Sequence, residues 1–266
     1  MNCISLFSGI GGLDLAAESC GFQVKVMVEI DEFCRSVLNK HFRGVDIHRD
    51  IYNFNAENYT NIDIVFGGFP CQPFSVAGNR KGEKDERYLW NEMLRVIKES
   101  KPRWVVGENV KGLLTSGIER IVSDLKLEGY TVWTQVFSAS STGALHQRER
   151  LFIVGFNAER PISDTTSNGR NGCKGIAGDS QINAGATQRK DKTECSEGRC
   201  GIRSVLPFGD YQKQWRTLPS ILRVSDGVSR KLDKRRIKSL GNAVVPQQAL
   251  VIFNAIKNFE NELKGN

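Results

Sequence analysis

The sequence predicts an α/β fold with a mostly parallel sheet and a second, smaller lobe inserted into it. Strand-like apolar runs alternate with helical patterns from residue 2 to about residue 155, which is typical of βαβ units. Residues 163–204 hold only scattered large apolar side chains, and the apolar pattern returns near Leu240. With 266 residues, 39% hydrophobic and 25% charged, the chain has the composition of a globular protein.

The first predicted unit is a buried strand at residues 3–7, followed by a glycine-rich turn and a helix. Apolar residues recur at helical spacing from Leu13 to Cys20, and Gly21 is placed to end this helix. A second strand is expected over 22–28. A second helix follows it, with Asp31 as the N-cap.

The same patterns predict the remaining elements. Residues 241–246 lead into a C-terminal helix whose apolar face runs from Ala249 to Ile256. Further strands are expected at 62–66, 104–106, 131–137 and 151–156, and further helices at 87–99 and 116–128.

The C-terminal helix needs a sheet to cover its apolar face, so the large domain is expected to be discontinuous. We assign residues 1–157 and 236–266 to this domain and residues 158–235 to the small lobe. Residues 163–204 are rich in Gly, Ser, Thr, Asn, Lys and Arg and cannot bury much by themselves. They form either a flexible insertion or a small lobe that becomes ordered on a partner.

Charge and composition limit the classes of partner and compartment. The net charge of +7 and the isoelectric point of about 9.1 suit a polyanionic partner. No stretch approaches a membrane span, and the N-terminus lacks the pattern of a signal peptide. A cytoplasmic protein with seven reduced cysteines is therefore expected. The histidines and cysteines form no recognisable ligand set, so no metal is expected.

Cys71 stands between Pro70 and Pro73, directly after the apolar run 62–66. A cysteine used for packing would sit in a periodic apolar face, whereas this one follows the end of a strand. A thiolate there would be a strong nucleophile toward soft carbon centres. Position alone also allows redox, hydrolytic or structural roles.

The turn from Phe7 to Asp14 is a candidate cofactor site. Gly9 and Gly11 let the backbone approach a ligand closely, and the free amides of the following helix favour polar or anionic groups. The third glycine position of a dinucleotide fingerprint holds Asp14, and Glu29 ends the second strand where such folds bind ribose hydroxyls. A nucleoside-containing cofactor is expected; a tight turn without a ligand is the alternative.

Five sequence blocks together carry a resemblance to a known family. They are Phe-Ser-Gly-Ile-Gly-Gly at 7–12, Gly-Phe-Pro-Cys-Gln-Pro-Phe-Ser at 68–75, Glu-Asn-Val at 108–110, Gln-Arg-Glu-Arg at 147–150 and Gly-Asn-Ala-Val-Val-Pro at 241–246. In this order and spacing they resemble the C5-cytosine-specific DNA methyltransferase family, in its prokaryotic or phage modification type. The resemblance covers residues 1–156 and 236–262.

The resemblance implies a Rossmann-like S-adenosylmethionine-dependent methyltransferase sheet with a small inserted target-recognition lobe. It implies that Cys71 adds to C6 of a cytosine, after which C5 takes the methyl group of S-adenosylmethionine and S-adenosylhomocysteine is left. It assigns Glu108 to proton donation at N3 of the base. Arg150, and with it Arg148, would steady the base and the thiolate or contact a nearby phosphate.

The resemblance also implies a set of cofactor contacts. Asp50 would accept a hydrogen bond from the exocyclic amine of adenine, and Ile51 would pack on the ring. The complete expected set is Phe7, Gly9, Gly11, Glu29, Ile30, Asp50, Ile51, Gly67, Pro70, Leu89, Asn242 and Val244.

A base inside a duplex cannot present C6 to a thiol, so the target cytosine must leave the stack. Residues 76–90 are expected to form a mobile loop that closes over double-stranded DNA. Basic residues of the small lobe and of the segment before the last block would contact phosphates. These are Arg170, Lys174, Arg189, Lys190, Arg199, Arg203, Arg230, Lys231, Lys234, Arg235 and Arg236.

Three functions remain open from the sequence. The favoured one is a monomeric DNA cytosine-5 methyltransferase paired with a restriction endonuclease. The second is a tRNA cytosine-5 methyltransferase of the same family, and the third is an inactive nucleic-acid-binding relative. The presence of Cys71, Glu108 and Arg150 argues against the third function, and Asp14 disfavours an oxidoreductase.

Overall fold

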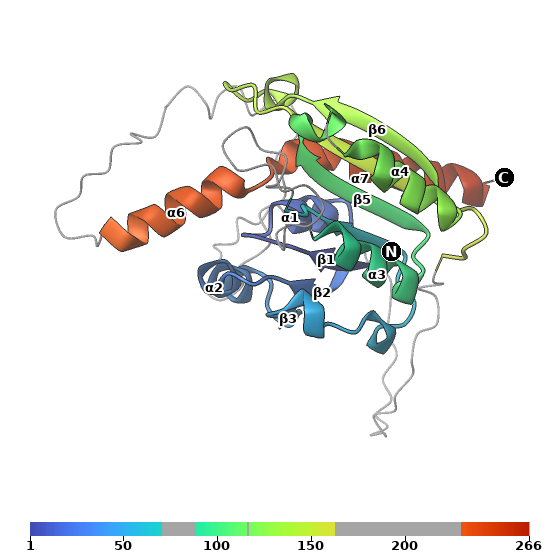
Figure 1. Ribbon diagram of the computed structural model, residues 1–266, viewed down its shortest axis with the longest axis horizontal. Coiled ribbons are helices and arrows are strands. Elements are labelled where there is room, and N and C mark those ends of the chain that lie inside the picture. Colours follow the sequence, from blue (N-terminus) through green and yellow to red (C-terminus); the bar gives the residue numbers. More distant parts are fainter. Residues whose placement is uncertain (71–88, 116, 163–229, 266) are drawn as a thin grey trace, which may run out of the picture. The chain divides into compact units, whose positions relative to one another are not determined.

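The computed structural model describes residues 1–70, 89–115, 117–162 and 230–265, and Figure 1 shows their arrangement. These residues all fall within one compact unit, Met1–Ser163 together with Val205–Asn266. A discontinuous large domain is in keeping with this unit. The predicted boundaries of the small lobe at 158 and 235 stay a prediction, because most of the lobe lies outside the described residues.

The described residues form a seven-stranded sheet in the order β3-β2-β1-β4-β5-β7-β6. Five neighbouring strands run parallel, whereas β7 is antiparallel to both β5 and β6. The predicted α/β class with a mostly parallel sheet is confirmed. The strands are β1 (Asn2–Leu6), β2 (Gln23–Val28), β3 (Asp46–His48), β4 (Ile64–Gly67), β5 (Trp104–Val110), β6 (Thr131–Phe137) and β7 (Arg150–Phe156).

The helices form where the apolar spacing predicts them, with one addition. The side chain of Asp31 accepts a hydrogen bond from the amide of Cys34 and so caps α2 as expected, and Gly21 follows α1 with a φ of 84°. The basic helix α6 was not predicted. The α-helices are α1 (Gly12–Ser19), α2 (Glu32–His41), α3 (Trp90–Ser100), α4 (Ile118–Leu127), α6 (Arg230–Asn242) and α7 (Pro246–Gly265); the 3-10 helices are η1 (Ile51–Asn53), η2 (Ala56–Asn58), η5 (Lys111–Thr115) and η6 (Ala139–Thr142).

Side chains at alternating positions of the central strands pack into two apolar cores, one on each face of the sheet. On β1, Ile4 and Leu6 pack with apolar residues of α3 and α4, whereas Cys3 packs with residues of α1, α2 and α7. Figure 1 shows α3 and α4 on one face and α7 on the other. The C-terminal helix therefore covers the N-terminal sheet, as its apolar face predicts.

The direction of the strands decides where a site can form. The carboxyl ends of β1 to β5 lie at one edge of the sheet, and the antiparallel β7 begins there, with Arg150 paired to Val110. In open α/β sheets, ligands bind at this edge. Among the described residues, no helix combines the length and apolar character needed to cross a bilayer.

Candidate active site

Glu108 is the centre of the candidate site. It lies near the carboxyl end of β5 with only 7% of its surface exposed, and its burial raises the pKa of the carboxyl to about 7. Arg150 at the start of β7 opposes this shift, because its Nε lies 2.9 Å from Oε1 of Glu108. Arg148 lowers the pKa of Glu108 further, through its charge. The carboxyl is thus buried and paired, but still able to hold a proton near neutral pH.

The chain approaches position 71 directly against this carboxyl. Asn109 donates a hydrogen bond of 2.9 Å from Nδ2 to the backbone oxygen of Phe69. A Cβ atom on Gly68 would lie 2.9 Å from Oε2 of Glu108, so the main chain and the carboxyl are in close contact. Cys71 itself lies outside the described residues, as do residues 72–88. The structure therefore brings Glu108 together with the residues that precede Cys71.

The residues that flank the 71–88 segment contact each other. The rings of Phe69 and Trp90 lie with their centroids 5.3 Å apart. Trp90 is buried and donates a hydrogen bond of 2.8 Å from Nε1 to Oδ2 of Asp124 on α4. The points where the chain leaves and re-enters the described structure are thus fixed on the same apolar core.

The glycine turn after β1 adopts a conformation that explains its sequence. Gly9 and Gly11 have φ values of 58° and 88°, in the left-handed region that favours glycine. Glu29 accepts hydrogen bonds of 2.7 Å from the amide of Gly9 and 2.8 Å from the amide of Asp31. Glu29 therefore joins the ends of β1 and β2. Its predicted contact with ribose hydroxyls would use the remaining lone pairs of the same carboxylate.

A pocket of about 410 Å³ lies at the ends of β2 and β3. Two of its lining residues, Ile30 and Asp50, were predicted as cofactor contacts. Ile30 is 72% exposed, whereas the predicted ring contact Ile51 is buried in the apolar core. The pocket is lined by Ile30, His48, Arg49, Asp50 and Asn53.

Sequence reasoning missed three of these lining residues. The side chain of Asn53 donates a hydrogen bond of 3.1 Å to Oδ2 of Asp50, and the amide of Tyr52 donates one of 3.0 Å to Oδ1. His48 and Arg49 immediately precede Asp50, at the end of the three-residue strand β3. Their position next to a predicted site residue was the signal that could have identified them.

Arg148 has partners that the sequence did not predict. Its Nη2 donates hydrogen bonds to the backbone oxygens of Gly241, at 2.7 Å, and of Ala243. Burial first, and then the charge of Arg150, lower the pKa of Arg148. Its guanidinium is thus bound to the last sequence block, whereas Arg150 is paired with Glu108.

The other predicted cofactor residues lie at the same edge of the sheet or in the segment before α7. Phe7 follows β1, and Gly67 is the last residue of β4. A Cβ atom on Gly67 would clash with the backbone of Leu6. Pro70 and Leu89 flank the segment outside the described residues. Val244 is buried against α1, and Asn242 is exposed.

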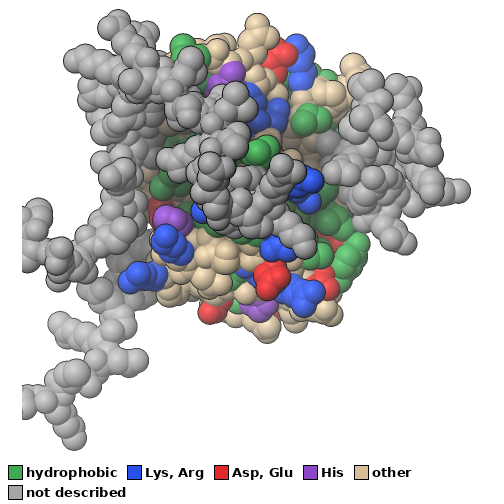
Figure 2. Space-filling model, turned by 90° about the vertical axis from the view of Figure 1, so that its left-hand side faces the viewer, with side chains coloured by type: hydrophobic (Ala, Val, Ile, Leu, Met, Phe, Trp, Pro, Cys, Tyr) green, Lys and Arg blue, Asp and Glu red, His purple; other side chains and the backbone are tan. Residues whose placement is uncertain are grey.

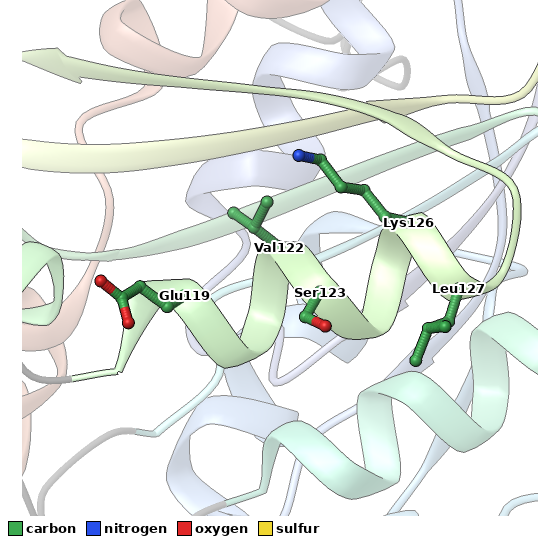
Figure 3. Close-up of a pocket in the computed structure, with 5 residues that line it drawn as sticks. All are labelled: Glu119, Val122, Ser123, Lys126 and Leu127. Atoms are coloured by element: carbon green, nitrogen blue, oxygen red, sulfur yellow. The ribbon is translucent and has the colours of Figure 1, made fainter.

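A second hollow, of about 440 Å³, contains none of the predicted residues. Its lining comes entirely from α4, and Figure 3 shows these side chains along successive turns of the helix: Glu119, Val122, Ser123, Lys126 and Leu127. Leu127 is 80% exposed. Ligand sites gather converging groups from several elements, so we place no function in this hollow.

Basic side chains are available for a polyanion. Figure 2 shows Lys and Arg side chains in several places on one face of the molecule, with hydrophobic side chains between them. On α6, the side chains of Lys234, Arg235, Arg236 and Lys238 are exposed. The predicted basic residues of the small lobe, from Arg170 to Arg203, lie outside the described residues. So do residues 76–88 of the predicted loop.

Comparison with known proteins identifies one family and several named relatives. The family model of C-5 cytosine-specific DNA methylase matches residues 1–201. Type II methyltransferase M.FnuDI of Fusobacterium nucleatum is 36% identical over 169 residues, which are 62% of this chain and 49% of that protein. Type II methyltransferase M.Bsp6I of Bacillus sp. (strain RFL6) is 39% identical over 160 residues, or 57% of this chain and 51% of that protein.

Solved structures agree with the fold. A protein described as a DNA modification methyltransferase encoded within an E. coli prophage matches with a TM-score of 0.52 and 33% identity, over 62% of this chain and 49% of that one. The Spodoptera frugiperda DNMT2 matches with a TM-score of 0.51 and 22% identity, over 59% of this chain and 50% of that one, and shows a shared fold only. The chain spans about half the length of the curated relatives it matches.

Proposed function

The chain belongs to the C-5 cytosine-specific DNA methylase family. From this premise we propose that it is a DNA (cytosine-5)-methyltransferase, which transfers a methyl group from S-adenosylmethionine to C5 of a cytosine flipped out of duplex DNA. The observation that carries the proposal is the position of Glu108. This carboxyl is buried, and it touches the backbone three residues before Cys71. Burial raises its pKa to about 7.

The described residues fit S-adenosylmethionine as the methyl donor. This cofactor supplies an electrophilic methyl group on a sulfonium. The pocket at the ends of β2 and β3 offers the apolar side chain of Ile30 and the carboxylate of Asp50, which suit an adenine ring and its amine. The glycine turn brings a backbone without side chains to the same edge, where a polar group can approach the first amides of α1.

The chemistry that we propose uses residues of this chain in three roles. The sulfur of Cys71 bonds to C6 of the cytosine, and the displaced electron pair becomes available at C5. Glu108 gives its proton to N3 and so neutralises the charge that this addition places on the ring. Arg150 holds Glu108 in place and stabilises the carboxylate that remains.

The remaining steps restore the enzyme. C5 takes the methyl group and then loses its proton to solvent, and the electrons of the C5–H bond restore the C5–C6 double bond. The C6–sulfur bond breaks, and the electrons of that bond return to the thiolate of Cys71. The proton on N3 returns to Glu108. The protein keeps no net proton, so Cys71 and Glu108 are ready for a second cytosine.

We further propose that the substrate is double-stranded DNA and that the protein acts as a monomeric type II modification enzyme with a cognate restriction endonuclease. The names of M.FnuDI and M.Bsp6I support the class. The exposed basic side chains of α6 support contact with phosphates. Sequence readout would come from the small lobe between residues 158 and 235.

The test is methyl transfer from S-adenosylmethionine carrying a labelled methyl group. The full chain is incubated with duplex DNA or with tRNA, and the modified base is mapped. We expect label at cytosine C5 in DNA and no transfer by Cys71→Ala. Transfer to tRNA alone would replace the proposed substrate, and full activity of Cys71→Ala would exclude the proposed nucleophile.

A further inference from the structure

Arg148 and Arg150 are separated by one residue but serve different partners. The guanidinium of Arg150 is paired with Glu108 at 2.9 Å. The guanidinium of Arg148 donates from Nη2 to the backbone oxygens of Gly241 and Ala243, which lie more than ninety positions later in the chain. Arg148 also has a φ of 35°, in the left-handed region. A backbone strain of this kind persists where surrounding contacts hold it.

Gln248 on α7 holds the same turn from another side. Its side chain is fully buried, and Nε2 donates hydrogen bonds of 2.8 Å to the oxygen of Phe137 and 3.1 Å to the oxygen of Arg148. The end of β6 and the start of β7 are thereby tied to α7. Both the backbone oxygen and the guanidinium of Arg148 are therefore bound by the C-terminal segment.

Residues 241–244, which Arg148 holds, contact the start of α1 next to the glycine turn. A Cβ atom on Gly12 would lie 2.6 Å from the backbone oxygen of Val244, so the two backbones are in contact there. Gly12 begins α1, immediately after Gly9 and Gly11. Apolar residues of α1 and α7 also share one core. A series of contacts thus runs from Arg148, two residues before the partner of Glu108, through residues 241–244 to the end of the glycine turn.

We propose that Arg148 is a positioning residue that joins the turn before β7 to the cofactor turn, and that Gln248 fixes this junction from α7. Arg148 then contacts neither the base nor a phosphate. The inference rests on the proposed function, since it takes the glycine turn as part of the S-adenosylmethionine site. Loss of the junction frees residues 241–244 to move away from α1, and the cofactor turn loses its support before any DNA is bound.

The test is calorimetric binding of S-adenosylhomocysteine to the DNA-free full chain. Arg148→Met removes both hydrogen bonds, and we expect its Kd to rise at least tenfold. Arg148→Lys keeps the charge and can restore part of the contact, so its Kd should lie in between. Lys111→Met is the matched control. It removes a cation that pairs with exposed Glu149 at 3.0 Å, and its Kd should equal that of the wild type.

Gln248→Met provides a second route to the same junction, should Arg148→Met fail to fold. We expect a higher Kd for S-adenosylhomocysteine here too. In a double variant with Arg148→Lys, the loss of binding free energy should be smaller than the sum of the two single losses. Salt dependence separates positioning from phosphate binding. Loss of a phosphate contact would reduce the slope of log KM for DNA against log salt by about 0.9, whereas loss of a positioning residue leaves it unchanged.

The outcomes separate this inference from the proposed function. If wild-type protein binds no S-adenosylhomocysteine, the proposed function fails and the inference fails with it. If the wild type binds it, and Arg148→Met and Gln248→Met bind it equally well, the inference alone is wrong. A reduced salt slope for Arg148→Met together with an unchanged Kd would assign Arg148 to a phosphate instead.

Discussion

Glu108 lies where its protonation state depends on a balance between burial and two arginines. Burial disfavours the carboxylate, and the charges of Arg150 and Arg148 favour it. The result is a pKa of about 7, well above the usual value of a glutamate. A group poised near the working pH is suited to exchange a proton with a substrate.

The pH profile of Glu108→Gln tests this role. In the proposed mechanism the protonated carboxyl is the active form, so kcat/KM of the wild type should fall as the pH rises above about 7. Glutamine donates a hydrogen bond but transfers no proton, so the rate should drop by roughly 100-fold to 10,000-fold. The decline near pH 7 should also disappear.

Glu149→Gln is the control for this profile, because Glu149 stands on the same edge in an exposed pair with Lys111. Its profile should match that of the wild type. A Glu108→Gln variant that keeps the wild-type decline near pH 7 would assign that titration to another group and remove Glu108 as the proton donor.

Asp14 is a second buried acid, and here the expected effect is on stability. Burial raises its pKa to about 7, from about 4 in an unfolded chain. The folded protein then retains a proton that the unfolded chain releases, so stability falls as pH rises from about 4 to 7 and is constant above. Asp14→Asn should remove part of this decline, a few kcal/mol in free energy of unfolding.

Thermal unfolding between pH 4 and 8 measures the difference. The melting temperature of Asp14→Asn should depend less steeply on pH than that of the wild type. Glu119→Gln, which removes an exposed acid on α4, should leave the slope unchanged. Parallel curves for Asp14→Asn and the wild type would show that Asp14 is ionised in the folded protein.

At the scale of elements, α7 is joined to the sheet at both of its ends. Gln248 holds the first turns, and Glu260 holds the far end by accepting hydrogen bonds of 2.8 Å from Nε of Arg103 and 2.6 Å from Nε1 of Trp104. Arg103 also donates to the backbone oxygens of Ala158 and Arg160, where the chain leaves β7. The pair is buried, so the loss of one partner leaves a charge without compensation.

Glu260→Ala should therefore lower the free energy of unfolding by about 3 kcal/mol in urea denaturation. Glu262→Ala changes an exposed glutamate on the same helix and should stay within about 0.5 kcal/mol of the wild type. Equal stability of the two variants would show that the attachment of α7 does not depend on Glu260.

The sequence predicted the elements better than their directions. The cap at Asp31, the helix end at Gly21 and the apolar spacing of α7 each depend on nearby residues and were confirmed. β7 was expected as a strand, but its antiparallel direction was not, because an apolar run reads alike in both directions. β3 was missed because it holds three residues with a single apolar side chain, Ile47.

The candidate site was also predictable from the sequence only in part. Position after a predicted strand supported Glu108 and Glu29, whereas Asp50 was expected from the family resemblance alone; the structure places all three at one edge of the sheet. The partners of Arg148 were not predictable, because they depend on how a segment ninety residues away packs against α1. Local patterns thus indicate which residues face the edge, whereas tertiary packing decides what each contacts.

At the scale of the whole molecule, the chain consists of a family domain and a short segment of different composition within it. The match to the family covers residues 1–201. Helix α7, which packs against the described sheet, lies beyond these residues near the end of the chain. The matched residues cover about half the length of the curated relatives. We expect further DNA contacts from the basic residues of 158–235 and of α6.

The most direct test of the central claim is a covalent complex with duplex DNA that contains 5-fluorocytosine. Fluorine cannot leave C5 as a cation, so an enzyme that adds to C6 and methylates C5 cannot complete the reaction on this base. In the presence of S-adenosylmethionine we predict a stable adduct, and mass spectrometry of its peptides should place the methylated base on Cys71. An enzyme that methylates ordinary cytosine but forms no adduct with the fluorinated base would contradict the account.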